Sequence, residues 1–226
     1  MFHKILLLSI CCYHSSNLSI GRIGETRGKL ENRLLKSNGI VLSHTEINHE
    51  RQTGMPYLAF EEFFPKPYQV RLYFKSSDGS RPKLSELESS KLSQAFDRNP
   101  PPKKPLKTLS KSKKRLEGWE LHVLFIKGLS ALEVYKKSNA ITESEIEYLL
   151  GLQKGQSFWS EISEDELPEG KFSALGIDLI RDDGILRAKK LGKRALMIFS
   201  SQTDEFFYHF QFKEQKEMAP ESIRGF

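Results

Sequence analysis

The chain of 226 residues has almost no cysteine, because its two cysteines, Cys11 and Cys12, are adjacent near the N-terminus. From Tyr13 onward there is none, which excludes a disulfide framework, a zinc–thiolate site and a cysteine nucleophile there. Charged residues make up 28% of the chain, and the negative mean hydropathy leaves no room for a bundle of membrane helices. The 38% of hydrophobic residues is nevertheless enough to bury a core, so a water-soluble fold is expected.

The familiar catalytic signatures are missing as well. The sequence has no Gly-x-Ser-x-Gly elbow, no His-Glu-x-x-His pair, no phosphate-binding loop ending in Gly-Lys-Ser/Thr and no dinucleotide fingerprint. Glu61-Glu62 would point to opposite faces of a strand, and Asp182-Asp183-Gly184 is explained as a turn, so neither pair supports a two-carboxylate hydrolase. No catalytic residue, cofactor site or metal site is predicted, and the chain is interpreted as leaning towards a non-enzymatic role.

A few scattered side chains are the remaining candidates for chemistry: His44, Glu46, His49, Glu50, His122 and His209. The first four suggest a metal site, but the two histidines among them would point to opposite faces of a strand. A solvated strand end is therefore the favoured interpretation. His122 and His209 each lie in an aromatic stretch that predicts a strand, and they are interpreted as edge or partly buried residues.

The N-terminus is typical of an export signal. A short basic start precedes an apolar run over residues 5–12, which is far below the roughly 20 residues of a membrane-spanning helix. Ser15, Ser16 and Ser19 compete as the site of cleavage. The sequence therefore predicts a signal peptide over residues 1–19 and a periplasmic or secreted product; the alternative is that this run is a buried N-terminal strand.

Two helices are predicted, each by a threonine N-cap. Thr26 precedes a helix whose leucines at positions 30, 34 and 35 share one face, and Gly39 offers the left-handed residue that ends helices. Thr142 and Glu145 form a capping box, which predicts a second helix starting there.

Alternating apolar residues and turn signals predict strands at 40–42, 68–74, 119–127, 129–137, 176–180, 196–199 and 205–212. The last of these would align Phe206, Tyr208, Phe210 and Phe212 on one face. The fold class is α+β: an antiparallel β-meander up to residue 135 with the two helices packed against it. Residues 155–212 either extend this sheet or form a second small helix-plus-sheet unit. The helix-then-strands order of 26–74 recurs in 142–212, which suggests a duplication.

A polar insertion rich in serine, lysine and proline, residues 76–117, separates residues 20–75 from residues 118–213, and a tail follows at 214–226. Within this insertion, residues 103–115 hold seven cations and no acid: Lys103, Lys104, Lys107, Lys111, Lys113, Lys114 and Arg115. Such a flexible arm would be attracted to a polyanion, whether anionic lipid, polysaccharide or nucleic acid. It has no aromatic residue for base stacking, so specific binding of nucleic acid is not expected. The alternative is a solvated linker.

Three motifs carry a resemblance: Ile23-Gly24-Glu25-Thr26, the helix at 141–150, and Gly155-Gln156-Ser157-Phe158-Trp159. Together they resemble a bacterial family of small exported proteins without an assigned function. The resemblance leaves out the insertion, and it implies export and fold but no chemistry. The architecture is also similar to that of β-lactamase inhibitor proteins and of small outer-membrane assembly lipoproteins, a likeness that transfers no function.

Three functions are therefore considered. The first is an exported, non-enzymatic binding or structural module of the envelope that offers a sheet face or edge to a protein partner. The second is a peripheral polyanion binder that acts through residues 103–115. The third is an unrecognised hydrolase.

Overall fold

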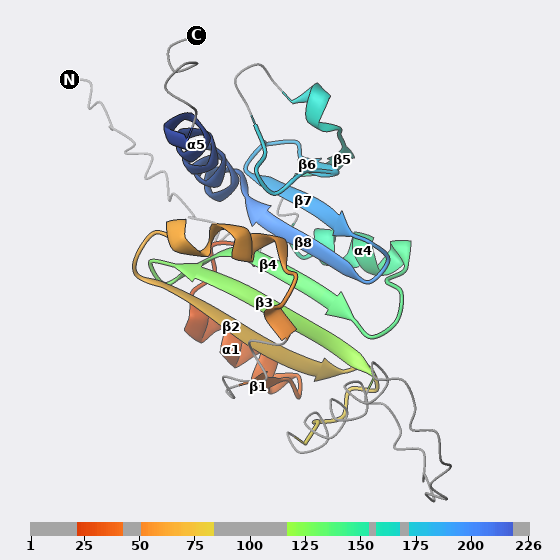
Figure 1. The fold of residues 1–226 in the computed structure, drawn as a ribbon. Coiled ribbons are helices and arrows are strands. Elements are labelled where there is room, and N and C mark those ends of the chain that lie inside the picture. Colours follow the sequence, from red (N-terminus) through yellow and green to blue (C-terminus); the bar gives the residue numbers. More distant parts are fainter. Residues whose placement is uncertain (1–21, 43–50, 84–116, 154–156, 168–171, 219–226) are drawn as a thin grey trace, which may run out of the picture.

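The computed structural model describes residues 22–42, 51–83, 117–153, 157–167 and 172–218. One antiparallel sheet of eight strands has the order β1-β2-β3-β4-β8-β7-β6-β5 (Figure 1). The strands are β1 (Ile40–Leu42), β2 (Tyr68–Ser76), β3 (Gly118–Ile126), β4 (Leu129–Lys137), β5 (Trp159–Glu161), β6 (Leu179–Arg181), β7 (Leu186–Leu191) and β8 (Ala195–Ser200). The helices are α1 (Arg27–Lys36), α4 (Glu143–Gly151) and α5 (Ser201–Met218), with 3-10 helices η1 (Pro56–Phe63) and η2 (Glu164–Glu166). The predicted α+β class is confirmed, and the C-terminal half extends the sheet.

The predicted hairpin at the centre of the meander is present. β3 and β4 pair from Trp119 opposite Lys137 to Ile126 opposite Leu129, with one irregularity in register. The two connecting residues, Lys127 and Gly128, both have positive φ, 51° and 81°. This backbone matches the right-handed twist of the strands, which is why a glycine at this point predicts the turn.

The two halves of the sheet have the same arrangement of strands and meet at the β4–β8 pair. In each half a helix capped by threonine, Thr26 or Thr142, is associated with four strands, of which the first lies at an edge of the sheet and each later one lies closer to the centre. Leu30 and Leu34 of α1 and the residues at the same distances from the cap in α4, Ile146 and Leu150, are all buried. The repeated order noted in the sequence is thus a repeat of architecture as well.

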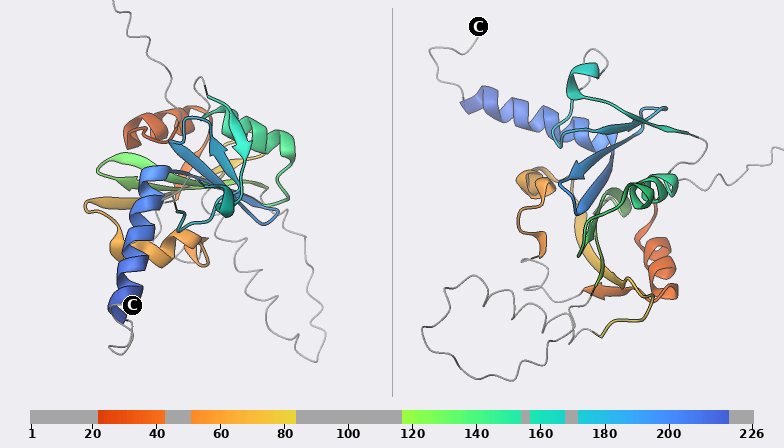
Figure 2. Two further views of the ribbon diagram at one scale, coloured as in Figure 1. Left: turned by 90° about the horizontal axis from the view of Figure 1, so that it is seen from above. Right: turned by 90° about the vertical axis from the view of Figure 1, so that its right-hand side faces the viewer.

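Both helices of this repeat cover the same sheet face, called face A here (Figure 2). Their leucines and isoleucine pack on alternate residues of the central strands: Leu121, Val123 and Phe125 of β3, Tyr135 of β4, Ala188 of β7, and Leu196 and Ile198 of β8. This is the arrangement expected for the two predicted helices.

The opposite face, face B, is covered by η1 and α5 (Figure 2). Tyr57 and Phe60 of η1 and Phe207 of α5 are buried against Val134 of β4 and Phe199 of β8. Face B over the central strands is therefore part of the core, and the expected open sheet face is occupied by the chain's own elements.

The strand predicted at 205–212 is wrong, because these residues belong to α5, which runs on to Met218 past the predicted boundary at 213. His209 accordingly lies in a helix. Aromatic residues at every second position also place pairs four residues apart, so the pattern fits a helix: Phe206 lies 4.6 Å from Phe210 and Tyr208 lies 6.4 Å from Phe212, between ring centroids.

Two details of α1 also differ from expectation. Leu35 is 43% exposed instead of sharing the buried face. The left-handed residue after the helix is Asn38, with φ of 64°, and not Gly39. Gly39 is required for another reason, since a Cβ there would stand 2.9 Å from the carbonyl oxygen of Leu34.

Several predictions lie outside the described residues. These are the signal peptide at 1–19, the histidines and glutamates between 44 and 50, and the basic segment with Lys103, Lys104, Lys107, Lys111, Lys113, Lys114 and Arg115. Among the helices that the structure describes, none has the length and apolarity needed to cross a membrane.

Candidate functional sites

A buried polar cluster ties η1 to face B of the sheet. The ring of His122 on β3 is fully buried, and its Nδ1 lies 3.0 Å from the hydroxyl of Tyr57. Glu120 lies two residues before His122 on β3, and one of its carboxylate oxygens is 3.7 Å from Nε2 of His122. Arg51 forms an ion pair with the other oxygen of Glu120, and Lys136 of β4 approaches within 4.0 Å.

Protonation in this cluster follows from burial. Burial lowers the pKa of His122, although Glu120 opposes the shift, so the imidazole is neutral at pH 7. Burial raises the pKa of Tyr57, which therefore keeps its proton, and its hydroxyl shares a hydrogen bond with Nδ1 of His122. Burial also acts to raise the pKa of Glu120, but His122 and Arg51 outweigh it and the pKa is lowered.

The order carboxylate, imidazole, hydroxyl resembles the relay of a hydrolase. Here, however, the residue in the place of the nucleophile is Tyr57, which is 0% exposed and faces the sheet from η1. The cluster therefore positions η1 on face B and does not present a reactive group to a substrate.

A second buried cluster lies on face A between the two halves. Glu133 of β4 is fully buried; one oxygen accepts from the hydroxyl of Tyr135 and, at 3.2 Å, from the amide of Gln153. Its other oxygen has no hydrogen-bond partner among the described residues. Arg22 donates to the Tyr135 hydroxyl at 3.2 Å, and the backbone N–H of Ile23 donates to Gln153 at 3.0 Å. Burial raises the pKa of Glu133, so the cluster favours a protonated carboxyl.

A third cluster anchors the start of α5. Arg187 of β7 is 2% exposed and donates to Asp204 at 2.6 Å and to the carbonyl of Phe172 at 2.6 Å. The other oxygen of Asp204 accepts from the backbone N–H groups of Ala174 and Leu175, at 2.9 and 3.0 Å. This buried ion pair thereby joins a strand, a loop and a helix N-terminus.

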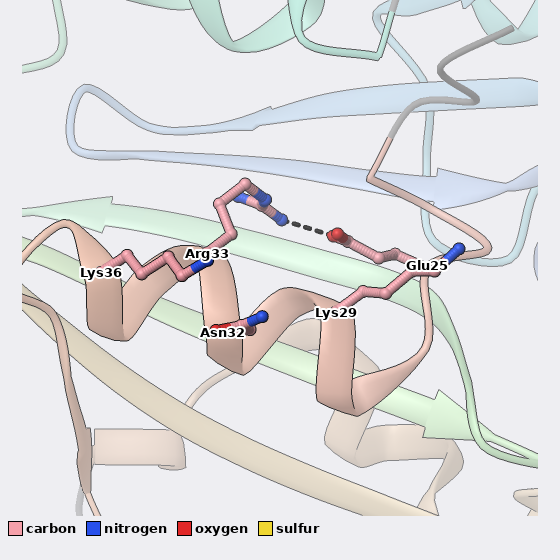
Figure 3. A pocket seen from close by; sticks show the side chains of 5 residues that line it. All are labelled: Glu25, Lys29, Asn32, Arg33 and Lys36. Atoms are coloured by element: carbon pink, nitrogen blue, oxygen red, sulfur yellow. Dashed lines mark hydrogen bonds and ion pairs between the residues drawn. The ribbon is translucent and has the colours of Figure 1, made fainter. Parts of the chain in front are cut away.

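The outer surface of α1 carries a different kind of site. A shallow pocket of about 440 Å³ is lined by Glu25, Lys29, Asn32, Arg33 and Lys36 (Figure 3). Arg33 pairs with Glu25 at 2.5 Å, which is the dashed contact in Figure 3. We call Lys29, Asn32, Arg33 and Lys36 the cationic flank. Lys29, Asn32 and Lys36 are exposed and Arg33 is partly buried, so these side chains can meet a ligand without any change in the fold.

Of the candidates from the sequence, His122 is the one that the structure places inside a polar cluster. Glu61 and Glu62, which were expected to lie in a strand, belong instead to the 3-10 helix η1, where both are exposed. Asp183 occupies the predicted turn, where it accepts from the backbone N–H of Ile185 and pairs with Arg181 at 2.6 Å. In the described part of the chain, no three His, Cys, Asp or Glu side chains are placed together to hold a metal ion.

The sequence did not reveal the residues that make these clusters. Glu133 and Arg187 alternate correctly within strands, but nothing local shows that they are buried or paired. The start of α5 had a readable signal, since Ser200 caps the backbone N–H of Thr203 at 3.2 Å and Asp204 follows in the first turn.

Known proteins offer no further guide at this point. In comparisons with protein families, characterised proteins and solved structures, no match to this chain was found.

Proposed function

We propose that this protein is an exported, non-enzymatic binding module that works at the cell envelope or outside the cell. One contrast supports the binding role. The buried polar groups, exemplified by His122, Glu133 and Arg187, join elements of the fold to each other. In the cationic flank of α1, by contrast, Arg33 pairs only with Glu25 just before the helix, and Lys29 and Lys36 make no ion pair within the described residues and face solvent.

The structure also bears on which surface would bind. Face B of the central strands is covered by η1 and α5, and face A by α1 and α4. A partner would therefore meet the outer surfaces of the helices, or an edge strand, instead of an open sheet face.

Export is tested by fractionating cells that express the full chain and by reading the N-terminal sequence and intact mass of the product. A periplasmic or secreted species that begins between His14 and Ile20 is the expected result. A cytosolic product that retains Met1 would overturn the export proposal.

A second candidate function is peripheral binding of polyanions through the basic segment at 103–115. One observation favours it: the chain enters and leaves the insertion beside the C-terminal end of α1. The amide of Asn38 donates to the carbonyl of Gly79 at 2.9 Å, and the backbone N–H of Ser77 donates to the carbonyl of Glu117 at 3.0 Å. Residues near the two ends of the insertion, Gly79 and Glu117, are thus held close to the end of α1 that carries Lys36 of the cationic flank.

This candidate is tested by replacing all seven cations of the segment with glutamine and measuring co-sedimentation with anionic vesicles at low and high salt. Binding by the segment should be weakened by salt, because counterions compete with the protein for the charged surface. If the glutamine variant sediments with the vesicles as well as the unmodified protein does, this function is abandoned.

A further inference from the structure

The cationic flank has more cations than form ion pairs within the described residues. Of its three cations, Arg33 pairs with Glu25, while the ammonium groups of Lys29 and Lys36 make no ion pair within the described residues. The side-chain amide of Asn32, which lies between them, likewise makes no hydrogen bond there. Two free cations and a free amide therefore stand on one exposed surface (Figure 3).

Helix stability explains two of these three cations but not Lys29. Arg33 and Lys36 lie in the last turn of α1, where the helix dipole favours cations. Lys29, however, is the third residue after the N-cap, near the positive pole, where a cation is disfavoured. The same position in α4 is Glu145, which completes the capping box, and the positions of Arg33 and Lys36 correspond to Leu149 of α4 and to its C-cap residue, Leu152. The comparison of the two halves thus singles out α1 as the helix that departs from the stabilising pattern.

The spacing of these groups suits an extended ligand. Lys29 and Lys36 are two helical turns apart, about 10 Å along the axis of α1. A guanidinium binds planar carboxylate or sulfate groups by two parallel hydrogen bonds, and a free amide can both donate to and accept from hydroxyl groups. No aromatic ring is among the five residues that line the pocket, so stacking of nucleic acid bases has no platform there.

The charges of the neighbouring helix, α4, bear on which class of anionic ligand could bind to α1. α4 presents two exposed carboxylates, Glu143 and Glu147, in the layer that it shares with α1, while Glu145 is paired with Lys137 at 2.6 Å. A flat anionic membrane that touched both helices would meet these acids, and like charges repel. A narrow chain lying along α1 alone avoids them.

From these features we infer that the cationic flank of α1 binds a linear acidic polysaccharide, whose carboxylate or sulfate groups pair with Lys29, Arg33 and Lys36 and whose hydroxyls meet Asn32. This inference names a ligand for the proposed binding module and in that sense rests on it. It predicts a site in the described part of the chain that is separate from the segment at 103–115.

The test uses the purified full chain and heparin, a linear sulfated polysaccharide, as the probe, with affinity measured at a physiological ionic strength of about 0.15 M. The test variant is Lys29→Glu/Lys36→Glu. The matched control is Lys193→Glu/Arg194→Glu, which makes the same change in charge in the exposed β7–β8 turn. Thermal unfolding of both variants confirms that each is folded.

Loss of about tenfold in heparin affinity for the α1 variant, equal to about 1.4 kcal/mol, with a loss of less than about threefold for the control, is the expected result. Equal losses in the two variants would mean that only net charge matters, and would overturn the site. The inference also fails if anionic vesicles or duplex DNA bind as tightly as heparin with the same dependence on Lys29 and Lys36. Because this assay does not involve export, its outcome is independent of the fractionation experiment.

Discussion

The buried ion pair between Arg187 and Asp204 offers the sharpest test of how α5 is held. Substituting Asp204→Ala removes the carboxylate that faces a guanidinium only 2% exposed, and it leaves the backbone N–H groups of Ala174 and Leu175 without their acceptor. The substitution also weakens the start of α5, because an acid in the first turn favours the helix. A large loss of stability is expected from these combined effects.

The magnitude follows from the surroundings of Arg187. Removal of one partner from a buried ion pair costs about 3–5 kcal/mol, since the remaining charge stays buried without compensation. Glu205 lies 3.1 Å from the same guanidinium and offsets part of this cost. We therefore expect a loss of about 3 kcal/mol, or roughly 6–12 °C in Tm for a chain of this length.

The assay is urea unfolding followed by circular dichroism, with Glu205→Gln as the control. Glu205 is 28% exposed, so its substitution should cost less than about 1 kcal/mol. Arg187→Met in the Asp204→Ala background should recover stability, because it removes the unpaired cation. The reasoning is refuted if Asp204→Ala unfolds within about 1 kcal/mol of the unmodified protein, or if the double variant is no more stable than the single one.

Three further predictions concern single positions. Burial raises the pKa of Glu133 above its ordinary 4.5, so the contribution of Glu133 to stability is lost as pH rises. The free energy of unfolding of Glu133→Gln should therefore increase relative to that of the unmodified protein between pH 4 and pH 8, as measured by urea titration. A difference between the two proteins that does not depend on pH would contradict this. Thr142→Ala should cost about 1 kcal/mol by the same assay and more than Thr26→Ala, because only the cap at Thr142 is part of a capping box; equal costs would count against that argument. Gly118→Ala should destabilise strongly, since its Cβ would stand 2.4 Å from a backbone carbonyl of β2, whereas Gly28→Ala, with open space around it, should raise Tm slightly. A neutral Gly118→Ala would show that the paired ends of β2 and β3 can move apart.

Local signals in the sequence were enough for several elements. Thr26 and Thr142 mark helix starts because a hydroxyl that accepts a backbone N–H acts within a few residues. Gly128 marks the hairpin because few other residues adopt a positive φ without strain. The α+β class follows from these helices together with the predicted strands, because the apolar face of a helix must be buried against another element.

The tertiary structure decided what depends on residues far apart in the chain. The spacing of the aromatic residues in 205–212 does not distinguish a strand from a helix, because residues four apart satisfy both periods. The helix is selected by contacts with other elements: Phe207 stacks on Phe60 with 4.9 Å between ring centroids, and Asp204 meets Arg187. The pairing of Tyr57 with His122, across 65 residues, is of the same kind.

For the candidate site, too, some features follow from the sequence and others depend on the fold. The sequence by itself determined that cations are plentiful and that sites built from cysteine are excluded after Tyr13. Only the fold separated the ionisable groups into those that are buried, such as Glu133 and Arg187, and those that are exposed on α1, such as Lys29 and Lys36. The physical reason is that a charge is neutralised or paired when folding removes it from water, and which charges are removed is a property of packing that no short stretch of sequence contains.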